Sequence, residues 1–126
     1  MVTITYCLRR KPGLSREAFL HYWHHTHAPL VARHADTLGI LRYVQKHALP
    51  DAYAEDLREG RGAPAGFDGV AEISFASLDS LAAAGSNPGF AEAARALLED
   101  EAEFIDMANS PIGLCEDHVV IGHGMG

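Results

Sequence analysis

Cysteines, basic residues and long apolar runs are all scarce in this 126-residue sequence. Its two cysteines, Cys7 and Cys115, both stand in apolar, strand-like contexts and predict buried thiols rather than a disulfide framework. Ten Lys and Arg against 17 Asp and Glu give a formal charge of −7, which argues against nucleic acid or an anionic membrane as partner. Because no apolar run has spanning length and no signal pattern opens the chain, we expect a soluble, cytoplasmic protein.

The motifs of the common cofactors are also missing. There is no glycine loop of the phosphate-binding type, no flavin or haem motif and no HExxH pattern. Two histidine pairs have a helical spacing that suits a metal, but the sequence places no third ligand: His21 with His25, and His24 with His27. We therefore expect no metal and no cofactor. The length and the 48% apolar content predict one domain over residues 1–126.

Four of the eight histidines and the only tryptophan fall within one short segment, residues 14–30. Ser15 is a favourable N-cap, and an amphipathic helix is expected from about residue 16 to residue 27. On a helical wheel with about 100° per residue, one face collects the apolar side chains and carries His27 at its edge. The other three histidines lie on the flank or point away from this face: His24, His21 and His25. His27 is therefore the histidine that we expect to face the interior.

The remaining pattern alternates strands and helices. Strands are expected at residues 2–9, 40–47, 67–75 and 113–121. Helices are expected at residues 16–27, which resume to about residue 35 after a break or kink at Pro29, and at 78–84 and 88–106. Residues 48–66 predict a long surface loop, and residues 122–126 a flexible tail. The order β-α-β-β-α-β is that of the α+β, ferredoxin-like split βαβ fold, with a four-stranded antiparallel sheet and helices on one face only.

The uncovered face of such a sheet predicts an assembly. All four expected strands carry apolar residues on both sides, whereas the helices cover one side. Two sheets packed face to face would bury the other side, so we expect a homodimer.

Several motifs together resemble the EthD family of dimeric α/β-barrel proteins. They are Phe19-x-x-x-Trp23-x-x-x-His27-Ala28-Pro29, the Tyr43-x-Gln45 strand, and Phe67-Asp68-Gly69-x-x-Glu72 followed by Phe75. The resemblance implies a dimeric α/β barrel with a ligand held between helices and sheet inside each protomer. The wider superfamily includes cofactor-free monooxygenases, polyketide cyclases, isomerases and decarboxylases, so the fold alone does not choose the chemistry.

His27 is the main candidate catalytic residue. A neutral imidazole in an apolar pocket can act as general base or acid near neutral pH, although a core histidine bonded to a backbone carbonyl would show the same pattern. Glu72 stands in the most apolar part of its strand and could orient His27. Asp68, roughly 13 Å from Glu72 along the strand, is a second candidate orienter, or else it stabilises a turn at the strand entry.

Binding residues are expected beside these groups. Tyr43, Gln45 and His47 alternate on one face of a strand, where they could bind a phenolic or carbonyl oxygen or form hydrogen bonds at an interface. Trp23 and Phe75 would supply apolar walls, and His24 lies at the pocket rim or in solvent.

These residues favour a cofactor-independent acid–base enzyme acting on a small aromatic or polyketide-like carbonyl substrate. Isomerisation, cyclisation, dehydration, decarboxylation and oxygenation all remain open. The alternative is a non-catalytic small-molecule binding protein that works beside an oxygenase system.

Overall fold

The computed structural model describes residues 1–122, and the last four residues of the expected tail, 123–126, lie outside the described part. Four strands form one antiparallel sheet in the order β2-β3-β1-β4. Their bounds are β1 (Val2–Leu8), β2 (Arg42–His47), β3 (Gly69–Phe75) and β4 (Ile112–Glu116). This is the ferredoxin-like α+β sheet that the sequence predicts.

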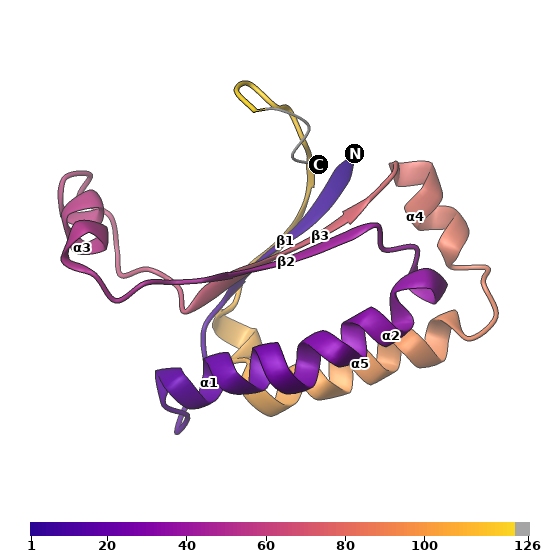
Figure 1. The fold of residues 1–126 in the computed structure, drawn as a ribbon, viewed down its shortest axis with the longest axis horizontal. Coiled ribbons are helices and arrows are strands. Elements are labelled where there is room, and N and C mark those ends of the chain that lie inside the picture. Colours follow the sequence, from indigo (N-terminus) through magenta and orange to yellow (C-terminus); the bar gives the residue numbers. More distant parts are fainter. Residues whose placement is uncertain (123–126) are drawn as a thin grey trace.

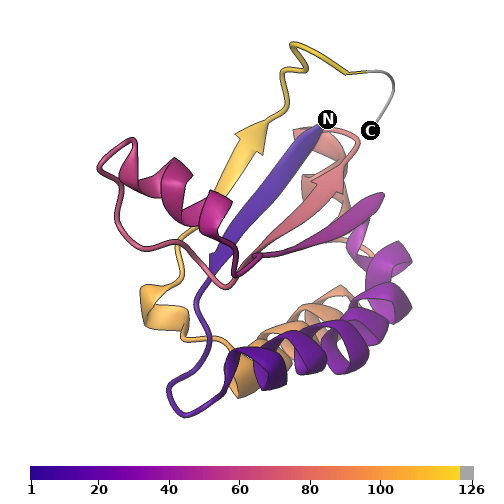
Figure 2. The same cartoon turned by 60° about the vertical axis from the view of Figure 1, so that its left-hand side comes forward.

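Except for α3 (Ala52–Glu59), the helices of residues 1–122 gather on one face of the sheet (Figures 1 and 2). The covering layer is made by α1 (Arg16–Tyr22), η1 (Trp23–His27), α2 (Ala28–Leu38) and α5 (Phe90–Phe104), and α4 (Leu78–Ala84) closes one end of it. A short 3₁₀ turn, η2 (Met107–Asn109), connects α5 to β4. None of the helices within residues 1–122 is both long enough and apolar enough to cross a membrane.

The histidine segment forms one continuous helix instead of breaking at Pro29. The Ser15 hydroxyl accepts from the backbone N–H of Ala18 at the start, and a π-helical turn spans Trp23–His27. In this wider turn the N–H of Ala28 bonds to the carbonyl of Trp23, five residues earlier, and Pro29 follows directly, so the local widening of the helix accommodates the N–H that proline lacks. The helix then continues to Leu38, beyond the expected end near residue 35.

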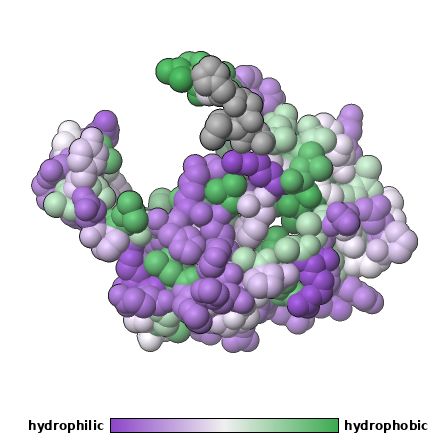
Figure 3. Space-filling model, in the orientation of Figure 1, coloured by the Kyte–Doolittle hydropathy of each residue, from purple (hydrophilic) through white to green (hydrophobic). Residues whose placement is uncertain are grey.

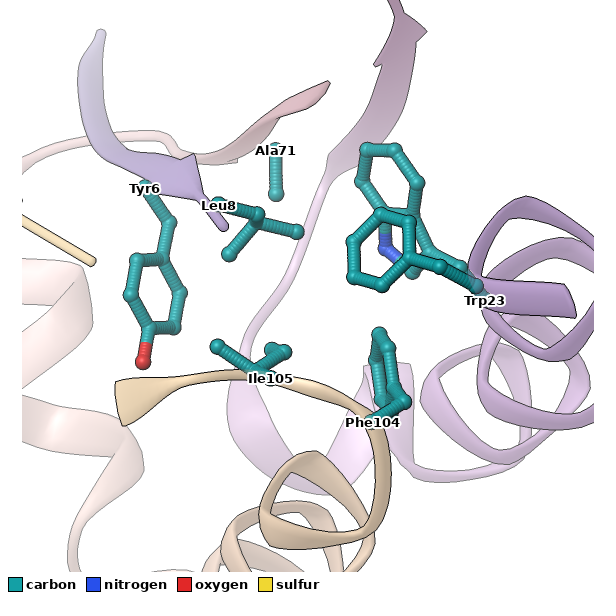
Figure 4. Close-up of a cluster of buried hydrophobic side chains, with 7 residues drawn as sticks. Tyr6, Leu8, Trp23, Ala71, Phe104 and Ile105 are labelled. Carbon is teal, nitrogen blue, oxygen red and sulfur yellow. The ribbon is translucent and has the colours of Figure 1, made fainter. Parts of the chain in front are cut away.

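The core lies where the first helix and the end of α5 meet the sheet. Its buried members are Tyr6, Leu8, Phe19, Trp23, Ala71, Phe104 and Ile105. Figure 4 shows Leu8 and Ala71 on the sheet facing Phe104 and Ile105, with the Trp23 ring reaching in from the helix. The Phe19 ring packs against both Trp23 and Phe104, with centroids 5.8 and 5.5 Å apart. These aromatic contacts fix the position of the segment that carries His27.

Two expectations about irregular segments are wrong. Residues 48–66 contain a helix, α3 (Ala52–Glu59), because Asp51 caps it through the N–H of Tyr53 and Arg58 pairs with Glu55. The α3 helix has no buried residue, so its sequence carries no apolar stripe from which a helix could be predicted. It stands away from the body of the protein (Figures 1 and 3). The last strand ends at Glu116 rather than residue 121, because β1 offers no partner beyond Val2.

Candidate functional site

A cavity of about 390 Å³ lies between the sheet and the helix layer. Its walls are mainly aliphatic and aromatic side chains from β1, β2, β3, α2 and α5. The polar groups that border it are Tyr6, Trp23, His27, Tyr43 and Glu101. A predominantly apolar cavity with a few polar groups is typical of a small-molecule site.

His27 is buried and faces this cavity, on the side of the helix that the wheel predicts. Its Nδ1 atom lies 2.7 Å from Oδ2 of Asp100 on α5. The other carboxylate oxygen of Asp100 accepts a hydrogen bond from the hydroxyl of Tyr22 at 2.5 Å. Asp100 is thus held by two donors, and it fixes the orientation of the His27 ring.

This arrangement determines which nitrogen of His27 can react. Because the carboxylate of Asp100 accepts, Nδ1 carries the proton and donates, which leaves the lone pair on Nε2. Burial lowers the pKa of His27 below its usual 6.5, and the hydrogen bond and charge of Asp100 offset only part of that effect. At neutral pH the ring is therefore neutral, with a basic Nε2.

Glu101 is the second ionisable group of the cavity. Burial, together with the neighbouring charge of Asp100, raises the pKa of Glu101 to about 7. Within residues 1–122 its side chain makes no hydrogen bond or ion pair. The charge of Glu101 also contributes to the raised pKa of Tyr6, after burial, so these groups act on one another across the cavity. Near neutral pH Glu101 can either donate or accept a proton.

Tyr43, Gln45 and His47 lie on the face of the sheet that the helices cover, where all three contact Trp23. The hydroxyl of Tyr43 accepts from Nε1 of Trp23 at 3.2 Å and from Nε2 of Gln45 at 3.0 Å. Gln45 also donates to the backbone carbonyl of Trp23 at 2.9 Å, so its amide is anchored on the π-helical turn. Of this row, only Tyr43 borders the cavity, and Tyr43 also borders a separate groove beside it, together with Gln45 and His47.

The other expected binding residues are also divided between the cavity and the neighbouring groove. Phe75 and Trp23 are apolar walls of the cavity, as the sequence predicts. His24 lies in the neighbouring groove, where its Nδ1 is 3.3 Å from Oε1 of Gln45. The ring of His47 stacks on Trp23, with centroids 4.8 Å apart.

The expected pair of His27 with Glu72 is wrong. Glu72 alternates with two cavity residues on β3, so it points to the opposite face of the sheet, where it pairs with Lys46 at 3.2 Å. Asp68 binds the backbone N–H of Arg10 at 2.9 Å and its guanidinium at 2.6 Å. Asp68 therefore ties the entry of β3 to the end of β1 and does not reach His27.

Four residues at or beside the site were not predicted as site residues from the sequence: Asp100, Glu101, Tyr6 and Tyr22. A signal for Glu101 was present, because it continues the apolar stripe of α5 that contains Phe90, Ala94 and Leu97. A carboxylate on the buried face of a helix indicates either a partner or a shifted pKa. No cluster of three or more metal-ligating side chains occurs in residues 1–122.

The comparisons agree with this architecture. The EthD domain matches residues 11–108, which include the histidine helix, two of the four strands (β2 and β3) and α5. The chain belongs to the EthD family. No curated protein matches it by sequence.

Solved structures show the same fold at low identity. An EthD family protein from Bacillus halodurans is 18% identical, with 94% of this chain and 99% of that chain covered and a TM-score of 0.64. SnoaB from Streptomyces nogalater, a cofactor-independent oxygenase, is 16% identical over 97% of both chains, with a TM-score of 0.55. A dimeric protein of unknown function with a ferredoxin-like fold, from Bacteroides fragilis, is 10% identical over 92% and 95%, with a TM-score of 0.56.

Proposed function

We propose that this EthD protein is an acid–base enzyme that moves a proton on a small, mainly apolar carbonyl compound of aromatic or polyketide-like type. One observation carries the proposal: His27, oriented by Asp100 at 2.7 Å, opens onto the same cavity as Glu101. A core histidine needs neither a carboxylate orienter nor a cavity, so this arrangement favours a catalytic role over a packing role.

Each group has a distinct task in this mechanism. Nε2 of His27 removes a proton from the carbon next to the substrate carbonyl, and the electrons move to the carbonyl oxygen as the enolate forms. Asp100 stabilises the imidazolium, and Tyr22 holds Asp100 in place. Glu101, protonated at and below about pH 7, donates to the developing oxyanion or returns a proton elsewhere on the substrate. The apolar walls exclude water and strengthen these interactions.

We propose that the reaction needs no metal, flavin or haem. The sequence contains none of their binding motifs, and a structural relative, SnoaB, is described as a cofactor-independent oxygenase. Proton abstraction by a buried base is the step that such chemistry has in common with isomerisation and cyclisation.

The second candidate is a non-catalytic binding protein. The cavity supports it because the apolar walls alone would hold a hydrophobic ligand. The two candidates differ in what His27 and Asp100 do: binding does not require the pair, whereas proton transfer does.

The deciding experiment follows deuterium incorporation next to a carbonyl. 1-Tetralone, a bicyclic aromatic ketone, is incubated with the protein in heavy water, and loss of the proton signal at C2 is measured by NMR. Catalysed exchange that disappears in His27→Ala supports the enzyme. Binding of the ketone without catalysed exchange supports the binding protein.

We also propose that the protein forms a homodimer through the uncovered face of its sheet. No helix covers that face in residues 1–122 (Figure 1). Its side chains include Val44 and Val70, set among threonines and the Lys46–Glu72 ion pair. The α3 segment and residues 117–122, after β4, extend on this side of the body and would flank a second copy (Figures 1 and 3).

A further inference from the structure

The hydrogen bonds around Tyr43 determine which kind of ligand atom can meet its hydroxyl. Two neighbours donate to the oxygen of Tyr43: the indole N–H of Trp23 at 3.2 Å and the amide of Gln45 at 3.0 Å. An indole nitrogen is a donor only, so the direction of the first bond is fixed.

The direction of the second bond is fixed by the backbone. Nε2 of Gln45 lies 2.9 Å from the carbonyl oxygen of Trp23, and a carbonyl only accepts. The amide of Gln45 therefore presents its NH₂ group to both Trp23 and Tyr43. The Oε1 atom of Gln45 points away from Tyr43 and lies 2.9 Å from Nε2 of His47 and 3.3 Å from Nδ1 of His24, which agrees with this orientation of the amide.

A phenol oxygen has two lone pairs and one proton to place. Both lone pairs of Tyr43 are occupied by donors, so its hydroxyl can take part in a further hydrogen bond only by donating its proton. Within residues 1–122 no acceptor lies within hydrogen-bond distance of that proton. Tyr43 is partly buried beside Trp23, between the internal cavity and the neighbouring groove, and the charge of Glu101 contributes to raising its pKa, after burial.

We infer that the Tyr43 hydroxyl is an obligate hydrogen-bond donor to the ligand, and that it selects compounds presenting a carbonyl or enolate oxygen at this point of the cavity. A group that can only donate, such as an ammonium or the N–H of an indole ring, would leave two donors facing each other at this point. Tyr43 is thus a specificity-determining residue, while Gln45 is a positioning residue that sets the polarity of Tyr43 without touching the ligand. The inference rests on the proposed function in that the cavity must hold a ligand.

Three neutral bicyclic probes separate these possibilities: 1-tetralone, which carries an acceptor oxygen; tetralin, which carries neither donor nor acceptor; and indole, whose N–H can only donate. Affinities are measured by calorimetry on the wild-type protein and on variants. We expect the wild type to prefer tetralone to tetralin by about 3- to 10-fold, the value of one net hydrogen bond, and to bind indole most weakly.

The variants give different patterns. Tyr43→Phe removes the hydroxyl and should abolish the preference for tetralone over tetralin. Gln45→Leu frees one lone pair of Tyr43, which could then accept from the N–H of indole, so indole should gain affinity while tetralone keeps its advantage over tetralin. Tyr53→Phe, on exposed α3, is the matched control and should leave all three affinities unchanged.

Infrared spectroscopy supplies a readout that packing would not affect. The carbonyl stretch of bound tetralone should lie at lower frequency in the wild type than in Tyr43→Phe, because a hydrogen bond weakens the C=O bond. An unchanged stretch, or an unchanged preference among the probes in Tyr43→Phe, would overturn the inference while catalysed exchange through His27 still stood. Failure of all three probes to bind would contradict the proposed function and the inference together.

Discussion

The indole ring of Trp23 lies directly against Gly69, at a point where no side chain could fit. A Cβ atom at residue 69 would stand 2.4 Å from Cζ3 of Trp23 and 2.9 Å from the backbone oxygen of Lys46. The absence of a side chain at the start of β3 therefore allows the tryptophan to reach the cavity wall and donate to Tyr43.

Gly69→Ala should destabilise the fold and displace Trp23. Overpacking of this kind costs about 1–3 kcal/mol, measured as the free energy of unfolding in urea. The emission of Trp23, the only tryptophan, should also shift because its environment changes. Gly113→Ala is the matched control, since a Cβ there meets nothing within 4 Å. Equal effects of the two substitutions would contradict the packing argument.

Glu101 should make stability depend on pH. Its carboxyl has a pKa of about 7 in the folded chain against an ordinary 4.5, so the folded state holds its proton more strongly. The resulting stabilisation is full below about pH 4.5 and is lost as the pH rises to about 7. Glu101→Gln should remove this decline, as measured by urea unfolding across the range. The lowered pKa of His27 makes stability rise with pH, but it does so in the wild type and in Glu101→Gln alike. If the free energy of unfolding changed with pH in the same way in the wild type and in Glu101→Gln, the pKa of Glu101 would not be raised.

The pH dependence of proton exchange should follow the same two groups. Activity requires neutral His27, so it should rise with pH through the lowered pKa of this residue. It also requires protonated Glu101, so it should fall as the pH passes about 7. In Glu101→Gln the fall at high pH should disappear, and the exchange rate should be lower at its maximum. A fall that persists in this variant would exclude Glu101 as the proton donor.

The order of strands and helices could be predicted because the apolar pattern changes its period from two to 3.6 along the chain. The same wheel placed His27 correctly, since a helix fixes which side chains share a face. The alternation of a strand shows which side chains share a face, but not which face the helices cover. Glu72 stands between Ala71 and Ile73, and only the packed structure shows that Ala71 and Ile73 face the helices. The carboxylate that orients His27 lies 73 residues away in sequence, and no local pattern connects the two.

The irregular parts were less predictable for physical reasons of their own. The π-helical turn at Trp23–His27 depends on a tertiary contact, the amide of Gln45 on the carbonyl of Trp23, as well as on Pro29. The α3 helix is held by its cap and by ion pairs of Arg58 with Glu55 and Glu59, and it buries no residue, so its sequence carries no hydrophobic stripe. The direction of the hydrogen bonds at Tyr43 required the positions of both of its donors.

The protein should be a dimer at micromolar concentration by sedimentation velocity. Val44→Glu places a charge on the uncovered sheet face and should shift the equilibrium towards monomer, because a buried unpaired charge is costly. Ala32→Glu introduces the same charge on the exposed side of α2 and should leave the assembly unchanged. A wild-type protein that sediments as a stable monomer would rule out the assembly.

Removal of metal ions should leave activity intact. The purified protein is expected to be colourless, and dialysis against a chelator should not slow deuterium exchange into 1-tetralone. Stoichiometric metal that survives dialysis and is required for exchange would contradict cofactor-independent catalysis.

The most direct test of the account compares turnover and stability in His27→Ala and His21→Ala. His27 borders the cavity and bonds to Asp100, whereas His21 is exposed on the same helix. Loss of a general base should reduce the exchange rate by about 10²–10⁴-fold in His27→Ala, and His21→Ala should stay near the wild-type rate. Thermal unfolding of both variants shows how much folded protein each rate refers to. An early-unfolding His27→Ala whose folded fraction exchanges deuterium at the wild-type rate would show that His27 only supports the core.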